Sequence, residues 1–74
     1  MVIDLVVTHT DDGYVADIPS IKGCDSWAHK EEDVIEKSLE LVRFYANVPE
    51  DNEIKVDRAR RQGKKVIYKL IFEK

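Results

Sequence analysis

The segment from Gly13 to Cys24 restricts the fold of this chain more than any other part of its sequence. It follows Asp11-Asp12, and turn residues of this kind between two apolar runs are typical of a β-hairpin. Pro19 has no backbone N–H to donate to a neighbouring strand, so the strand that starts at Tyr14 ends there or lies at a sheet edge. Gly23 suits a tight corner. The segment therefore predicts a hairpin, a corner and a third strand.

The flanking strands are predicted from alternation. Residues 2–8 are rich in β-branched side chains and place Ile3, Leu5 and Val7 on one face. Residues 24–28 predict a short strand whose two faces carry Cys24, Ser26 and Ala28 on one side and Asp25 and Trp27 on the other.

A helix is predicted from Glu31. Its first turn is acidic, as the helix dipole favours, and Pro49 requires it to end near Asn47. Side chains at helical spacing form one broad, mainly apolar stripe: Val34, Ile35, Ser38, Leu39, Leu41, Val42, Tyr45 and Ala46.

The last third of the chain, residues 54–74, predicts a C-terminal strand or hairpin. Residues 66–72 alternate with one fully apolar face, and Gly63 suits a turn before them. Whether residues 54–58 pair as a strand stays open. The predicted fold class is α+β, a single domain of residues 1–74. It has a mostly antiparallel four- or five-stranded sheet with one helix on a face, in the order β-β-β-α-β or β-β-β-α-β-β.

Size and composition narrow the class of protein. A chain of 74 residues with 43% hydrophobic residues builds only a small core, for which self-association is a common remedy. A lone cysteine forms no internal disulfide, and no apolar run reaches membrane-spanning length. We expect a cytoplasmic protein that does not enter a membrane and forms a homodimer or a higher homo-oligomer.

Charge is divided unevenly along the chain. Residues 1–53 carry 13 acidic and 4 basic side chains, whereas residues 54–74 carry 2 acidic and 8 basic ones. Such a division is compatible with nucleic-acid binding by the basic part. It is equally compatible with attraction between the two parts, within one subunit or between subunits, and this explanation needs no other partner.

Residues suited to chemistry are few. His9, His29 and Cys24 stand at no metal-ligand spacing, and Cys24 reads as a small buried apolar residue. Asp4, Asp17 and Asp25 would suggest a two-metal nuclease only if they converged on one point. No catalytic residue, metal or cofactor is therefore predicted.

Strand, hairpin, strand, corner, strand and helix follow one another in this chain. Within that order stand the motifs Gly13-Tyr14-Val15-Ala16, Pro19, Gly23-Cys24, Ser26 and Glu31-Glu32-Asp33. The combination resembles the N-terminal domain of HicB-type antitoxins over about residues 2–46. The resemblance implies a degraded RNase H-like fold. Ala28-His29-Lys30 depart from the family, which has a Ser or Thr helix cap there, and no DNA-binding segment is recognisable after the helix.

The resemblance also implies a function. HicB-type domains are non-catalytic interaction domains that bind and neutralise a small basic mRNA-cleaving toxin of the HicA type. For an antitoxin, or a module derived from one, acidic side chains would complement such a toxin. By charge and position we expect partner contacts among Asp11, Asp12, Asp17, Asp25, Glu31 and Glu32.

Two alternatives stay open. In the first, the basic segment 58–65 contacts RNA or DNA phosphates through Arg58, Arg60, Arg61, Lys64 and Lys65. The same residues also suit a solvated hairpin tip. In the second, the chain is an orphan domain of uncharacterised function that associates with itself through a free sheet face, using Val15, Trp27 and Ile71.

Overall fold

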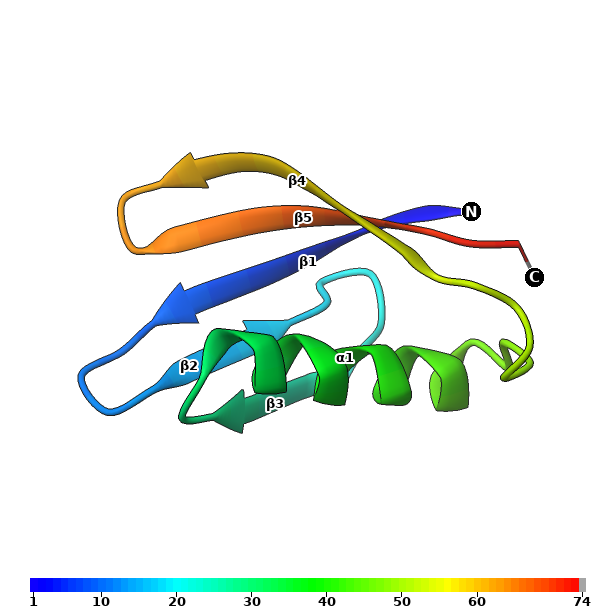
Figure 1. Ribbon diagram of the computed structural model, residues 1–74, viewed down its shortest axis with the longest axis horizontal. Coiled ribbons are helices and arrows are strands. Elements are labelled where there is room, and N and C mark those ends of the chain that lie inside the picture. Colours follow the sequence, from blue (N-terminus) through cyan, green and yellow to red (C-terminus); the bar gives the residue numbers. More distant parts are fainter. Residues whose placement is uncertain (74) are drawn as a thin grey trace.

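A computed structural model describes residues 1–73 and consists of a five-stranded antiparallel sheet with one helix on a face (Figure 1). The predicted α+β class is confirmed, with five strands. Residue 74, the end of the predicted segment 54–74, lies outside the described residues. The elements are β1 (Val2–His9), β2 (Tyr14–Asp17), β3 (Asp25–Ala28), α1 (Glu31–Tyr45), β4 (Lys55–Gln62) and β5 (Lys65–Ile71).

The strands lie in the order β3-β2-β1-β5-β4, so the N-terminal strand β1 is central. It pairs with β2 in the predicted hairpin and with β5 from the end of the chain. The side chains of Leu5, Ala16 and Leu70 are fully buried on the face that α1 covers. The predicted alternation of β1, β2, β3 and β5 is confirmed, because one burial face follows the period of two in each of them.

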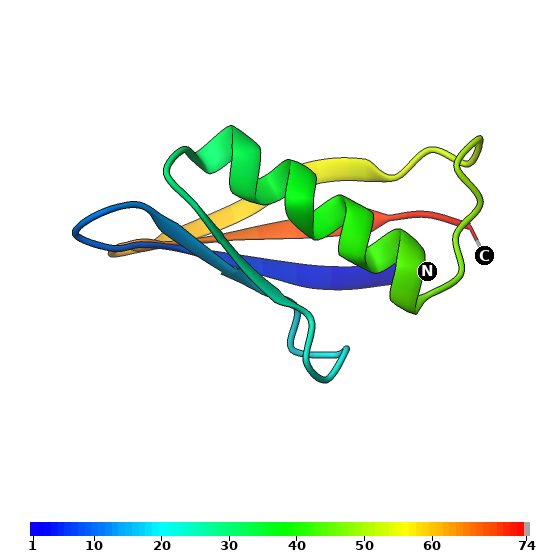
Figure 2. The same cartoon turned by 90° about the horizontal axis from the view of Figure 1, so that it is seen from below.

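Helix α1 packs against β3, β2 and β1, and crosses the strands obliquely (Figure 2). Val34, Ser38 and Val42 form its buried stripe. Tyr45, predicted to belong to that stripe, is 47% exposed, because the helix ends there and Ala46 takes the next buried position. Asn47 then turns the chain with a φ of 55°. None of the residues 1–73 belongs to a helix long and apolar enough for a membrane crossing.

Strand β4 differs most from what the sequence indicates. The sequence leaves open whether residues 54–58 pair as a strand, yet pairing with β5 runs from Lys55 to Gln62. All of β4 except Val56 is exposed, so the strand carries almost none of the apolar alternation by which strands are recognised. Its ladder bonds to β5 hold it in place instead. A register shift between Arg58 and Arg60 marks a β-bulge at Ala59.

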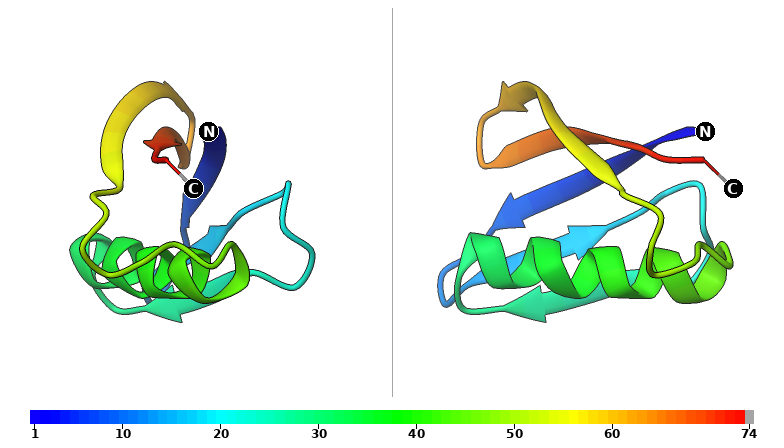
Figure 3. Two further views of the ribbon diagram at one scale, coloured as in Figure 1. Left: turned by 90° about the vertical axis from the view of Figure 1, so that its right-hand side faces the viewer. Right: turned by 45° about the vertical axis from the view of Figure 1, so that its right-hand side comes forward.

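The sheet face opposite α1 has no element packed on it in residues 1–73, and we call it the open face (Figure 3). Alternation and register place on it side chains from all five strands: Val2, Asp4, Val6, Thr8, Val15, Asp17, Asp25, Trp27, Lys55, Asp57, Arg60, Gln62, Lys65, Ile67, Lys69 and Ile71. The face is therefore a mixture of aliphatic and charged groups.

Candidate interaction site

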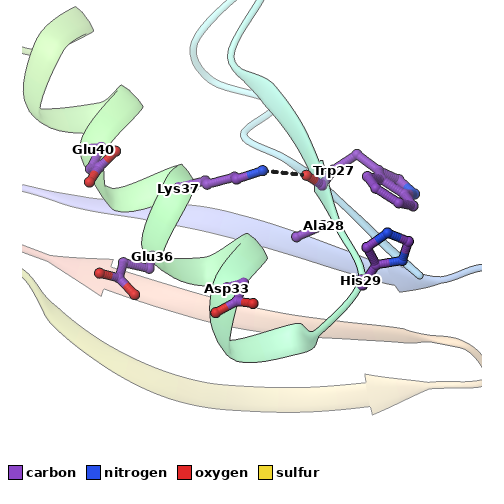
Figure 4. Close-up of a pocket in the computed structure, with 7 residues that line it drawn as sticks. All are labelled: Trp27, Ala28, His29, Asp33, Glu36, Lys37 and Glu40. Carbon is purple, nitrogen blue, oxygen red and sulfur yellow. Dashed lines mark hydrogen bonds between the residues drawn. The ribbon is translucent and has the colours of Figure 1, made fainter.

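A groove runs between the edge strand β3 and helix α1, with a volume of about 400 Å³ (Figure 4). We call it the β3–α1 groove. Its lining residues are Trp27, Ala28, His29, Asp33, Glu36, Lys37 and Glu40. Asp33, Glu36 and Glu40 lie along the helix and are exposed, so the helical side of the groove is predominantly acidic.

One hydrogen bond spans the groove. The Nζ atom of Lys37 donates to the backbone oxygen of Trp27 at 3.1 Å. The indole ring of Trp27 points away from α1 and meets the ring of His29 edge to face, with centroids 4.5 Å apart. The ring is 40% exposed. The Trp27 ring is thus an accessible aromatic surface on the open-face side of β3, whereas the acidic side chains lie on the helix side.

Strand β3 is an edge strand of the sheet, so one row of its backbone groups faces outward, and among these the Trp27 oxygen already accepts from Lys37. Ile18 N–H donates to the Cys24 oxygen, and the register pairs Ser26 with Ala16 and Ala28 with Tyr14. Since hydrogen-bonded and non-hydrogen-bonded pairs alternate in an antiparallel ladder, the backbone groups of Asp25 and Trp27 point outward. An edge of this kind is able to accept a further strand.

The acidic residues predicted as partner contacts do not form one surface. Asp17 and Asp25 lie opposite each other on the open face. Asp11 and Asp12 occupy the β1–β2 turn, whereas Glu31 and Glu32 start the helix. The turn and the start of the helix are joined by His29, whose Nδ1 lies 3.3 Å from the Asp12 oxygen. His29 does not cap the helix, and Lys30 at the cap position makes no side-chain capping bond.

The predicted basic cluster is also divided, and the bulge at Ala59 divides it. Simple alternation would place Arg58 and Arg60 on one face. In the structure Arg58 pairs with Tyr68 on the helix side, whereas Arg60 pairs with Ile67 on the open face. A single basic surface formed by all five predicted residues is therefore absent from β4 and its turn.

Acidic and basic segments instead meet each other in two places. On the open face Lys69 forms an ion pair with Asp4. On the helix side Glu31 shares a hollow of about 290 Å³ with Arg61 and Lys64. The ring of His9 borders the same hollow and stacks on Tyr14 with centroids 4.7 Å apart. His9 is thus an exposed residue at the rim of the sheet.

The charged groups of the helix side also act on Tyr68, which lies within the core. Burial and then the carboxylate of Glu31 raise the pKa of Tyr68 above 10.0, while Arg58 acts in the opposite direction. The phenol therefore stays protonated at neutral pH.

The residues considered for nucleophilic or metal chemistry lie in environments that do not favour either. Cys24 is buried, and burial followed by the carboxylates of Asp17 and Asp25 raises the pKa of its thiol above 9.0. A thiol held in its protonated form is a poor nucleophile. Asp4 is engaged by Lys69. Throughout residues 1–73, no three His, Cys, Asp or Glu side chains come close enough together to hold a metal ion.

The three residues predicted for self-association all lie on the open face, but not together. Val15 and Trp27 are directly opposite each other on β2 and β3. Ile71 lies beside Val2, at the other end of the strands. The face between them contains the Asp4–Lys69 pair.

The groove residues Asp33, Glu36, Lys37 and Glu40 were not identified as a site from the sequence. Their spacing of three, one and three residues is a signal for one helical face. Such a face is ordinarily just solvated, and only the position of β3 turns it into a groove. Comparisons of this chain with models of protein families, with characterised proteins and with solved structures gave no match.

Proposed function

We propose that this chain is a non-catalytic interaction domain of the HicB-like type, an antitoxin or a module derived from one. Its partner would be a small basic mRNA-cleaving toxin of the HicA type, which it neutralises by binding in the cytoplasm. The observation that carries the proposal is the acidic β3–α1 groove beside an open strand edge. It is joined to the resemblance of residues 2–46 to the HicB-type N-terminal domain.

The groove is suited to a basic protein in two respects. Asp33, Glu36 and Glu40 give its helical side a negative potential that speeds the approach of a cationic surface. The outward backbone groups of Asp25 and the outward N–H of Trp27 offer hydrogen bonds to an extended segment. Exposed charges direct association, whereas the exposed Trp27 ring is the kind of residue that contributes most of the binding energy.

The proposal is tested by searching beside this gene for a short reading frame that encodes a basic HicA-type protein, and by co-expressing the two products. We expect a stable complex and relief of growth arrest. The charge-reversing variant E36K/E40K should weaken the complex about tenfold or more, because two exposed carboxylates that attract a basic partner are replaced by ammonium groups that repel it. The matched control D51K/E53K reverses two exposed carboxylates in the loop after α1 and should bind like the unaltered chain.

Failure of the complex to form with every HicA-type protein of the source genome would refute the proposal. Equal binding by the groove variant and the control would show that the partner does not bind at the β3–α1 groove. In that case the acidic turn at Asp11 and Asp12 would be examined next, since it lies at the same end of the molecule as the start of α1.

A further inference from the structure

The open face has a pattern that is complementary to itself. Strands β1 and β5 lie next to each other at its centre, and their register partners alternate in character along the strands. Val2 is opposite Ile71, Asp4 is opposite Lys69, and Val6 is opposite Ile67. Aliphatic pairs thus flank an acid–base pair.

The outer strands continue this pattern with opposite charges. Asp17 on β2 lies beside Val6, and Arg60 on β4 lies beside Ile67. The row across the sheet therefore begins with a carboxylate, passes through two aliphatic side chains and ends with a guanidinium. Both Asp17 and Arg60 are exposed.

We propose that the open face binds a second copy of this chain, related by a two-fold axis parallel to the strands and running between β1 and β5. Such an axis lays β1 of one copy over β5 of the other. Val6 then meets Ile67 of the other copy, and Asp4 meets Lys69. Two sheets stacked in this way are separated by about 10 Å, with their strands nearly aligned. The interface is isologous, so each contact occurs twice.

The same two-fold axis brings the outer strands together with the correct charges. Strand β2 of one copy faces β4 of the other, which places Asp17 opposite Arg60 twice. A two-fold axis at right angles to the strands would instead lay β2 on β2 and β4 on β4. Like charges would then face each other, so the charge pattern selects the first arrangement.

Exposed apolar area on the open face also supports binding of a second copy of this chain. Val2 is 59% exposed, although it lies on the central strand β1 directly opposite Ile71. A domain of this size buries only about 60% of the surface of its unfolded chain, so covering one sheet face adds substantially to its core. A nucleic acid is a poor occupant, because the cations of this face are matched by its carboxylates and leave no net attraction for phosphates.

The decisive experiment is a charge exchange, read out as the dimer dissociation constant of the full chain by sedimentation equilibrium. The single variants D17R and R60D should each raise that constant about tenfold, since each change acts at two symmetry-related contacts. The double variant D17R/R60D should restore it. Within one chain the two positions are separated by three strand spacings, about 14 Å, so restoration requires contact between copies.

The control is D51R, an equal charge reversal in the exposed loop after α1, which should leave the dissociation constant unchanged. Circular dichroism checks that each variant is folded. If a charge variant does not fold, V6S tests the same interface, because it removes an aliphatic contact from the centre and should also raise the constant about tenfold. A chain that is monomeric at every concentration would overturn the proposal. So would a dimer that the single variants leave intact, or that the double variant does not restore. The proposal does not depend on the proposed function, which uses the groove on the helix side.

Discussion

Gly13 lies in contact with the indole ring of Trp27 and is buried by it and by the end of β3. A Cβ atom at Gly13 would approach the Ala28 oxygen to 2.5 Å and the Cζ2 atom of Trp27 to 2.9 Å. Gly23 and Gly63 have positive φ values, whereas Gly13 does not. Gly13 is therefore required for the close approach of β3, and not for a left-handed turn.

We expect Gly13→Ala to lower the free energy of unfolding by about 1–3 kcal/mol, because the new methyl group meets a backbone oxygen that cannot move away alone. Urea unfolding followed by tryptophan fluorescence measures the change. Gly63→Asn is the control, since φ is 60° there, the surrounding space is open and Asn tolerates this conformation. Its effect should stay below about 1 kcal/mol. Equal effects at both positions would contradict the packing role of Gly13.

Cys24 makes the stability of the fold depend on pH in the alkaline range. Burial raises the pKa of its thiol above 9.0, with smaller contributions from Asp17 and Asp25. The folded state thus holds the proton more tightly than the unfolded chain does. The resulting stability is fully present below the unfolded pKa and is lost as the pH rises above about 9 towards the folded value. Between pH 7 and pH 10, stability should fall more in the unaltered chain than in Cys24→Ala. Parallel curves for the two proteins would show that the thiol is not the source.

A pair of serine hydroxyls joins α1 to β3. Ser38 donates to the Val34 oxygen at 2.7 Å, and its hydroxyl oxygen lies 3.1 Å from that of Ser26. Since Ser38 has used its own proton, Ser26 is the donor between them. A double-mutant cycle of Ser26→Ala and Ser38→Ala should give a coupling of about 0.5–1 kcal/mol in unfolding free energy. Strict additivity would mean that the bond contributes nothing.

Truncation of two residues in the last turns of α1 should change the unfolding free energy by very different amounts. Val42 is fully buried, whereas Phe44 is 76% exposed. Val42→Ala should lower the unfolding free energy by about 2 kcal/mol through lost burial and a cavity. Phe44→Ala should change it by less than about 0.5 kcal/mol. Thermal or urea unfolding of the two variants tests the orientation of α1, and a larger loss at Phe44 would contradict it.

Where local patterns were strong, the sequence was sufficient to predict the fold. The β1–β2 hairpin, the short β3 and the helix follow from turn residues, alternation and helical spacing, each of which acts over a few neighbouring residues. Strand β4 carries no such pattern, because an edge strand with one weakly buried residue needs only backbone pairing. The bulge at Ala59 has no local signal either, and it places Arg58 and Arg60 on opposite faces of the sheet.

The candidate site was harder to predict from the sequence than the fold. Acidic residues were chosen by charge, but charge says nothing about which of them share a surface. The β3–α1 groove exists because β3 and α1 pack side by side, which brings Trp27 next to Lys37, ten positions along the chain.

The sequence by itself determined the types of all elements except β4, the apolar faces and the division into acidic and basic segments, since these depend on side chains at short spacing. Only the tertiary structure decided that β1 lies between β2 and β5, which joins residues as far apart as Asp4 and Lys69. Such pairings arise because long-range contacts must bury one shared core. Burial of that core depends on residues from distant parts of the sequence together, so no single local segment encodes the strand order.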